Sequence, residues 1–167
     1  FLKEAKKYRM VILRGNGKSF CAGADLNWMQ SMIKFTKAQN KQDSLKLFNM
    51  FQAIQKCEVP VIAQVHGNVF AGGLGLIAAA DIVLAEENTK FCFSEPKLGL
   101  VPAVISNFVA TKMNPSILRE VFLTAEVFLT DKALKSGLVH FAGTHTDCEV
   151  QMQWKIEALL KCGPEAI

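Results

Sequence analysis

The chain has 167 residues, of which 50% are hydrophobic and 20% are charged, and its formal net charge is +4. This length and composition are typical of one folded domain with a substantial core, and they exclude a disordered or fibrous chain. The lysines are scattered and form no basic stripe with interleaved aromatic residues, so nucleic-acid binding is not expected.

Short apolar runs bounded by turn residues predict strands, and apolar residues at helical spacing behind capping signals predict helices. The expected strands cover residues 11–13, 60–65, 82–85, 91–93 and 138–139. Helices are expected to begin within residues 27–35, after a cap at Asp43 or Ser44, at Leu74, at Pro102, at Asn114-Pro115 and after a cap at Thr130. A last amphipathic helix is expected to carry Met152, Ile156, Leu159 and Leu160. The polar residues 34–42 are expected to form a surface loop.

This order alternates strands with helices and then becomes mostly helical, which favours an α/β fold. The composition does not change along the chain and no linker separates two parts, so residues 1–167 are expected to form a single domain. The run from Val59 to Ala80 carries no charged residue, but it contains Pro60, Gln64, His66 and four glycines. A buried strand, turn and helix is therefore predicted there, and no membrane span.

Five cysteines lie far apart and form no CxxC pair, which favours reduced thiols in a cytoplasmic setting. The three histidines have no metal-ligand spacing, so no metal site is expected. No signal peptide is visible.

Two glycine-containing turns are the candidate binding elements. The stretch HGNVFAGGLG at 66–75 joins an apolar strand to a small-residue helix, and the stretch FCAGADL at 20–26 forms the other turn. The first amides of a helix have no internal acceptor and lie at the positive end of its dipole, so such a turn can hold an anion. If residues 22–24 and 71–73 meet, two amides could form an oxyanion hole for a carbonyl oxygen. The alternative is that the glycines only make a tight turn and close packing.

Glu95 is the candidate acid or base beside these turns, because it follows an apolar strand and lies between Phe93 and Pro96. An apolar setting raises the pKa of a carboxyl group and suits proton transfer near neutral pH. The alternative is an ordinary surface glutamate. Cys21 is expected to be a small packed residue, His66 a strand-end histidine, and Asp25 a turn or helix cap.

Three motifs carry a resemblance to a known family: FCAGADL at 20–26, HGNVFAGGLGL at 66–76 and FSEPKLGLVPA at 93–103. In order and separation they resemble the three signatures of the crotonase (enoyl-CoA hydratase/isomerase) superfamily, and the similarity runs over nearly the whole chain. Within it, NWMQ after GAD and PAVIS after the glutamate loop are most similar to bacterial methylglutaconyl-CoA hydratase and the related isohexenylglutaconyl-CoA hydratases.

The resemblance implies a repeated ββα spiral core that binds an acyl-CoA thioester, usually in a homotrimer or a dimer of trimers. The oxyanion donors of the family fall on the backbone amides of Ala24 and Gly72, and a catalytic glutamate falls on Glu95. Contacts to coenzyme A and the thioester fall on Ala22, Gly23, Ala24, Asp25, Leu26, Asn27 and Gly72. No separate cofactor is implied, because coenzyme A is part of the substrate.

Two departures from the family pattern matter. Hydratases of the family often carry a first catalytic glutamate where this chain has Gly75, and a single glutamate is also the pattern of double-bond isomerases. The family usually has a further early strand and C-terminal helices, so this chain is expected to be a piece of a longer polypeptide, incomplete at both ends. The leading hypothesis is a hydratase-type lyase of fatty acid metabolism or leucine degradation. An enoyl-CoA isomerase and a non-catalytic acyl-CoA-binding subunit are the alternatives.

Overall fold

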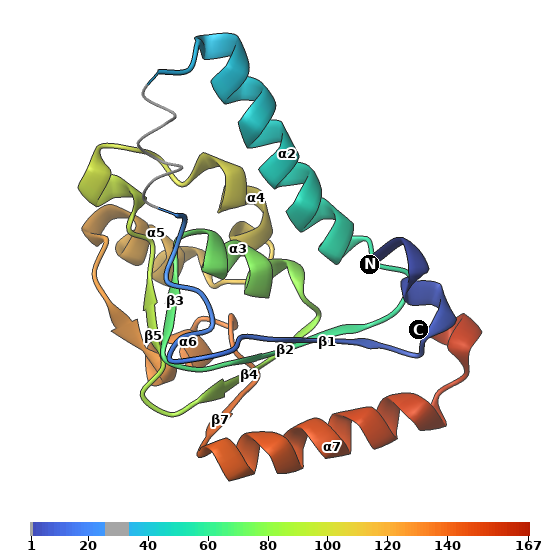
Figure 1. Cartoon of the computed structure of the whole chain (residues 1–167). Helices are drawn as coiled ribbons and strands as arrows, with labels where there is room; N and C mark the ends of the chain where they lie inside the picture. Colours follow the sequence, from blue (N-terminus) through green and yellow to red (C-terminus); the bar gives the residue numbers. More distant parts are fainter. Residues whose placement is uncertain (1, 26–33) are drawn as a thin grey trace.

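The computed structural model describes residues 2–25 and 34–167, and its strands form two sheets (Figure 1). The larger sheet has the order β1-β2-β4-β7, and all its strands are parallel. The smaller sheet has the order β3-β5-β6, with β3 parallel to β5 and β6 antiparallel to β5. The strands are β1 (Val11–Arg14), β2 (Val61–Val65), β3 (Asn68–Phe70), β4 (Ile82–Glu86), β5 (Lys90–Cys92), β6 (Phe128–Leu129) and β7 (Phe141–Gly143).

The smaller sheet continues the larger one after a sharp bend. Strand β2 passes into β3 through His66 and Gly67, and β4 passes into β5 through a short turn. Gly67 has φ +62°, and a Cβ built on it would lie 2.1 Å from the carbonyl oxygen of Lys18. Only glycine fits at position 67, because the loop after β1, at Lys18 and Ser19, crosses directly over its backbone.

The helices cover both faces of the larger sheet (Figure 1). They are η1 (Leu2–Lys7), α2 (Lys37–Gln55), α3 (Gly72–Ala79), η2 (Glu95–Leu98), α4 (Ala103–Ala110), α5 (Pro115–Thr124), α6 (Thr130–Lys135), α7 (His145–Lys161) and η3 (Pro164–Ala166). Side chains alternate between the faces of a strand. Ala63 and Val65 therefore belong to the core that contains Ile77 of α3, whereas Ile62 packs with Met152 of α7 on the other face.

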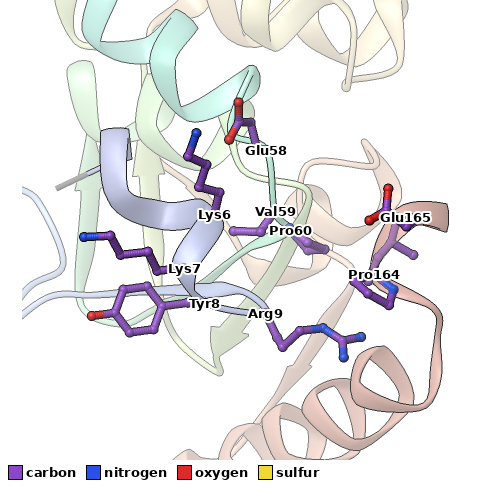
Figure 2. Close-up of a pocket in the computed structure, with 10 residues that line it drawn as sticks. Lys6, Lys7, Tyr8, Arg9, Glu58, Val59, Pro60, Pro164 and Glu165 are labelled. Carbon is purple, nitrogen blue, oxygen red and sulfur yellow. The ribbon is translucent and has the colours of Figure 1, made fainter.

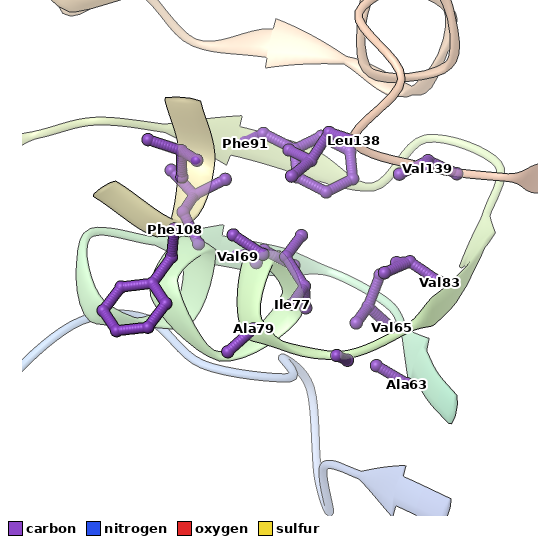
Figure 3. Packing of buried hydrophobic residues seen from close by; sticks show 14 of the residues in the cluster. Ala63, Val65, Val69, Ile77, Ala79, Val83, Phe91, Phe108, Leu138 and Val139 are labelled. Atoms are coloured by element: carbon purple, nitrogen blue, oxygen red, sulfur yellow. The ribbon is translucent and has the colours of Figure 1, made fainter. Parts of the chain in front are cut away.

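The main core lies between the two sheets and the helices α2 to α5. Figure 3 shows Val69, Ile77, Phe91 and Leu138 from four different segments packed together. All five residues of β2 are buried, which explains why this strand appears in the sequence as a continuous apolar run.

Most of the expected elements are confirmed, three expectations are wrong, and two strands are additional. The polar stretch 34–42 is not a loop, because Thr36 and Gln39 form a capping box that starts α2 at Lys37. Thr130 is not the expected N-cap of the next helix: Leu129 is the N-cap, α6 begins at Thr130 itself, and the Thr130 hydroxyl donates to backbone carbonyls. Residues 138–139 are buried but form no strand, and the strand follows at β7. The short strands β3 and β6 were not expected.

The helix expected to begin within residues 27–35 has its apolar residues Trp28, Met29 and Met32 outside the described part of the chain. Across residues 2–25 and 34–167, no helix is long and apolar enough to cross a membrane. The charge-free run Val59–Ala80 forms β2, β3 and α3. The predicted strand and helix are confirmed, and the short strand β3 lies where only a turn was expected.

Candidate active site

Three parallel segments end at one edge of the smaller sheet. Phe70 of β3 lies opposite Cys92 of β5, and Cys21 forms a parallel bridge with Val69 of β3. The residues that follow these segments, 22–24, 71–72 and 93–95, therefore meet at the same edge. Ligands of parallel α/β sheets bind outside the carboxyl ends of their strands. The three predicted motifs thus supply one candidate site.

The first turn along the chain, which contains Cys21 and Gly23, lies directly against the start of α3. A Cβ built on Gly73 would lie 2.9 Å from the Cβ and 3.2 Å from the carbonyl oxygen of Cys21. A Cβ built on Gly23 would lie 4.0 Å from the Cβ of Ala71. The backbone of Cys21 also bonds to β3 on both sides, through Asn68 O and Phe70 N. The two turns are therefore in contact.

Gly72 is the first residue of α3, so its amide has no acceptor within the helix. The residue before it, Ala71, has φ 48° and ψ −116°, an uncommon conformation for a residue with a side chain. The amide of Ala71 donates to the carbonyl of Cys92 over 3.0 Å, which ties the start of α3 to the end of β5. Such strained backbone is found preferentially at functional sites.

Glu95 begins η2, three residues after β5 ends. Its Oε2 atom is buried and has no hydrogen-bond partner in the described part of the chain. Burial raises the pKa of this carboxyl group above its ordinary value of 4.5, and a hydrogen bond from its own backbone opposes the rise. A half-buried carboxyl group with an unused oxygen is suited to exchange protons with a ligand.

The space beside Gly75 is already filled. A Cβ at this position would lie 2.5 Å from Cγ2 of Ile105 and 2.8 Å from Cζ of Phe51. Both neighbours belong to the buried core, and Phe51 also packs edge-on against Phe108. A second carboxylate at this helix position would have no room. The sequence places Phe51 on the apolar face of its helix, but no local signal predicts its contact with α3, since helix packing decides it.

The other predicted residues have ordinary surroundings. Cys21 is partly buried in the bridge to β3, as expected for a packed residue. The Nε2 atom of His66 lies 2.9 Å from the carbonyl oxygen of Gly17, which suits the expected strand-end role. Asp25 is the last residue described before residues 26–33, and the predicted contact residues Leu26 and Asn27 lie outside the described part.

Two cavities lie elsewhere on the molecule. One of about 430 Å³ lies between the two ends of the chain and is lined by Lys6, Arg9 and Pro164 among others (Figure 2). Another of about 410 Å³ lies at the bend between the sheets. Its charged groups are paired among themselves, Arg14 with Glu149 and His145 with Glu86. Neither cavity is lined by Glu95 or Gly72. In residues 2–25 and 34–167, no three metal-binding side chains gather into a group.

The sequence model of the family described as Enoyl-CoA hydratase/isomerase matches residues 2–167. The enoyl-CoA hydratase ACTT6 of Alternaria alternata is 35% identical over 130 residues, which are 78% of this chain and 42% of that protein. The human mitochondrial Delta(3,5)-Delta(2,4)-dienoyl-CoA isomerase is 34% identical over 141 residues, with 78% of this chain and 43% of that protein covered.

Solved structures match over almost the whole chain. An enoyl-CoA hydratase from Shewanella pealeana matches with a TM-score of 0.93 at 40% identity, covering 99% of this chain and 63% of that one. An enoyl-CoA hydratase/isomerase from Marinobacter aquaeolei matches with a TM-score of 0.90 at 27% identity, covering 99% and 66%. The chain spans about half the length of the curated relatives it matches.

Proposed function

The chain belongs to the enoyl-CoA hydratase/isomerase family, and we propose that it acts on an unsaturated acyl-CoA thioester, with hydration of the double bond as its reaction. The crotonase-like α/β fold expected from the sequence is confirmed by the structural matches. The proposal rests on one observation: the three parallel segments that precede the turn of Cys21 and Gly23, the start of α3 and Glu95 end at the same sheet edge.

In the proposed reaction, the backbone amides of Ala24 and Gly72 donate to the thioester oxygen. The negative charge that forms on this oxygen in the enolate is then held by two donors and by the positive end of the α3 dipole. Residues 22–27 would flank the thioester and coenzyme A. The close approach of Cys21 to the backbone of Gly73, with Gly23 near Ala71, supports this pairing of turns.

Glu95 would handle the proton. Its carboxylate takes a proton from a water molecule while the water oxygen bonds to C3 of the enoyl thioester, and the electrons of the double bond move to the thioester oxygen. The same proton then goes from Glu95 to C2 as the enolate collapses. The Oε2 atom of Glu95, which has no hydrogen-bond partner among residues 2–25 and 34–167, and the raised pKa of this group support this role.

Double-bond isomerisation is the second candidate, and the packing at Gly75 favours it. Because Phe51 and Ile105 fill the space there, the site has room for one carboxyl group at these positions. A single carboxyl group suffices to move a proton between C4 and C2 of a 3-enoyl thioester. A non-catalytic acyl-CoA-binding subunit is the remaining alternative.

The test is turnover of the full-length protein with 2-enoyl and 3-enoyl thioesters. Hydration removes the absorbance of the conjugated 2-enoyl thioester, whereas isomerisation of a 3-enoyl thioester creates it. Glu95→Gln should lower kcat by at least about 100-fold while thioester binding stays within a few-fold. Binding by calorimetry without turnover on either substrate would support the non-catalytic alternative, and full activity of Glu95→Gln would remove Glu95 from the mechanism.

The acyl chain and the assembly are further parts of the proposal. A substrate with a distal carboxylate, such as methylglutaconyl-CoA in leucine degradation, would need a nearby cation. Lys97 follows Glu95 by two residues in η2 and is exposed, and Arg119 of α5 is the other candidate. Rates with methylglutaconyl-CoA and with short linear enoyl-CoAs would separate these substrates, and light scattering would test the proposed homotrimer.

A further inference from the structure

The side chain of Lys112 binds the C-terminal end of α3, the helix that begins at Gly72. The last carbonyls of α3 have no donors within the helix. The Nζ atom of Lys112 donates to two carbonyls at this end, those of Ile77, at 3.2 Å, and of Ala80. Lys112 itself is anchored at the end of α4, where its amide donates to Val109 O over 3.1 Å.

Helix α4 therefore holds α3 at two points. Near the start of α3, Ile105 of α4 lies against the bare backbone of Gly75. At the end of α3, Lys112 bonds to the carbonyls of Ile77 and Ala80. An eight-residue helix is about 12 Å long, so a tilt at one end displaces the other. The two attachments fix both the tilt and the axial position of α3.

The charge of Lys112 is poorly hydrated and depends on its neighbours. Burial lowers the pKa of its amine to about 8, and the negative charge of Asp81, which follows α3, opposes this decrease. The Asp81 carboxylate accepts the amide of Val61 over 2.7 Å. His140 accepts the amide of Val83 through Nδ1, and its pKa is lowered first by burial and then by the charges of Lys112 and of Lys155 on α7.

We propose that Lys112 is a positioning residue, which fixes α3 so that the Gly72 amide at its other end points at the thioester oxygen. This inference rests on the proposed function. A cation at a helix C-terminus also offsets the negative end of the helix dipole, which favours an anion at the opposite end. Lys112 itself is not placed in contact with the substrate.

The test compares Lys112→Met, Lys112→Gln and Lys112→Arg in the full-length protein. Methionine keeps most of the unbranched apolar part of the side chain but donates no hydrogen bond, glutamine donates without a charge, and arginine keeps both the donor and the charge. We expect kcat to fall roughly five- to tenfold in Lys112→Met, with KM changed less than twofold. Lys112→Gln should lie in between, and Lys112→Arg should recover most of the loss.

A second measurement does not depend on turnover. Acetoacetyl-CoA forms an enolate that absorbs in the ultraviolet, and the enolate fraction of the bound thioester reports how well its oxygen is stabilised. Lys112→Met should lower this fraction by a similar factor. The matched control is Lys132→Met, which removes a lysine that bridges Glu120 and Glu126 on the surface and should leave both measurements unchanged.

The outcomes separate the two proposals. If Lys112→Met and Lys112→Gln keep kcat and the enolate fraction within twofold while Glu95→Gln loses turnover, the positioning role is wrong and the proposed function stands. If the unaltered protein turns over neither the 2-enoyl nor the 3-enoyl thioester, the proposed function fails whatever the lysine variants do. A lower stability with unchanged kcat and enolate fraction would reduce Lys112 to a structural cap.

Discussion

The ring of Phe51 lies against the bare backbone of Gly75, so close that a Cβ at this position would be 2.8 Å from Cζ. The same ring lies 3.9 Å from where a Cβ on Gly72 would be. Phe51 comes from α2 and is fully buried. One aromatic side chain from a distant helix therefore supports the first turn of α3, whose first amide is a proposed oxyanion donor.

Gly75→Ala should destabilise the protein, although alanine is the better helix former. Helix propensity alone predicts a gain of up to about 1 kcal/mol. The overlap with Ile105 and Phe51 should outweigh it and give a net loss of about 1–2 kcal/mol in the free energy of unfolding. Urea denaturation measures this value.

The control for Gly75→Ala is Gly72→Ala in the same helix, where the added Cβ makes an ordinary contact with Phe51. It should lose less than about 0.5 kcal/mol. Adding Phe51→Leu to Gly75→Ala should recover part of the loss, since the two sites share one space and their effects are not additive. A stabilised Gly75→Ala variant would show that the packing around α3 is looser than the distances indicate.

Strands β1, β2 and β4 of the larger sheet could be predicted because their signal is local, whereas β7 begins after residues 138–139, where a strand was expected. Strand β2 is a continuous buried apolar run, and its neighbours in the sheet have similar runs. The two-residue strand β6 could not be predicted, because its pairing with β5 is decided by tertiary contacts. The early start of α2 had a local signal, the capping box of Thr36 and Gln39, but the polar composition of residues 34–42 favoured a loop.

The candidate site could be predicted in part for a similar reason. Glycines at strand-to-helix turns and a glutamate after an apolar strand are visible in the sequence, and parallel pairing then places them at one edge. The contacts of Phe51 with Gly75 and of Lys112 with α3 depend on how helices pack. No spacing in the sequence connects residues so far apart along the chain.

Glu95→Gln should stabilise the protein at neutral pH and not at acidic pH. The pKa of Glu95 is raised in the folded protein, so the folded protein binds more protons than the unfolded chain between the two pKa values. The contribution of Glu95 to stability is therefore fully present below the ordinary pKa of 4.5 and is lost as pH rises through the folded value. Glutamine lacks this charge and this pH dependence.

The measurement for Glu95 is the melting temperature of both proteins from pH 4 to pH 8. The melting temperature of Glu95→Gln should exceed that of the unaltered protein by an amount that increases as pH rises and then becomes constant. Glu165→Gln, at an exposed position near the end of the chain, is the control and should show no such change. Equal melting temperatures across the whole range would mean that the buried Oε2 atom costs the folded protein nothing when the group is ionised.

The ion pair between His145 and Glu86 should give the protein a second pH dependence. It has the same direction as that of Glu95, but it comes from attraction between charges and not from burial. Nδ1 of His145 lies 2.6 Å from Oε1 of Glu86, and this hydrogen bond is the main cause of the raised pKa of His145. The stabilisation is fully present below the ordinary pKa of 6.5 and is lost as pH rises through the folded value. Nuclear magnetic resonance titration should show a lower midpoint for His145 in Glu86→Gln. The neighbouring change Glu87→Gln should leave the midpoint in place, and a midpoint independent of Glu86 would contradict the pairing.

Removing the Gly72 amide proton tests the proposed oxyanion hole directly. Gly72 is the first residue of α3, a position where proline is tolerated because its missing N–H has no acceptor in the helix. Gly72→Pro deletes the donor, whereas Gly72→Ala adds a side chain and keeps it. The loss of one oxyanion donor costs about 100- to 1,000-fold in kcat. We therefore expect kcat of Gly72→Pro to lie at least about 100-fold below that of Gly72→Ala, when both fold to similar melting temperatures. Equal rates in the two variants would show that the Gly72 amide does not bind the developing charge, and the proposed pairing with Ala24 would have to be abandoned.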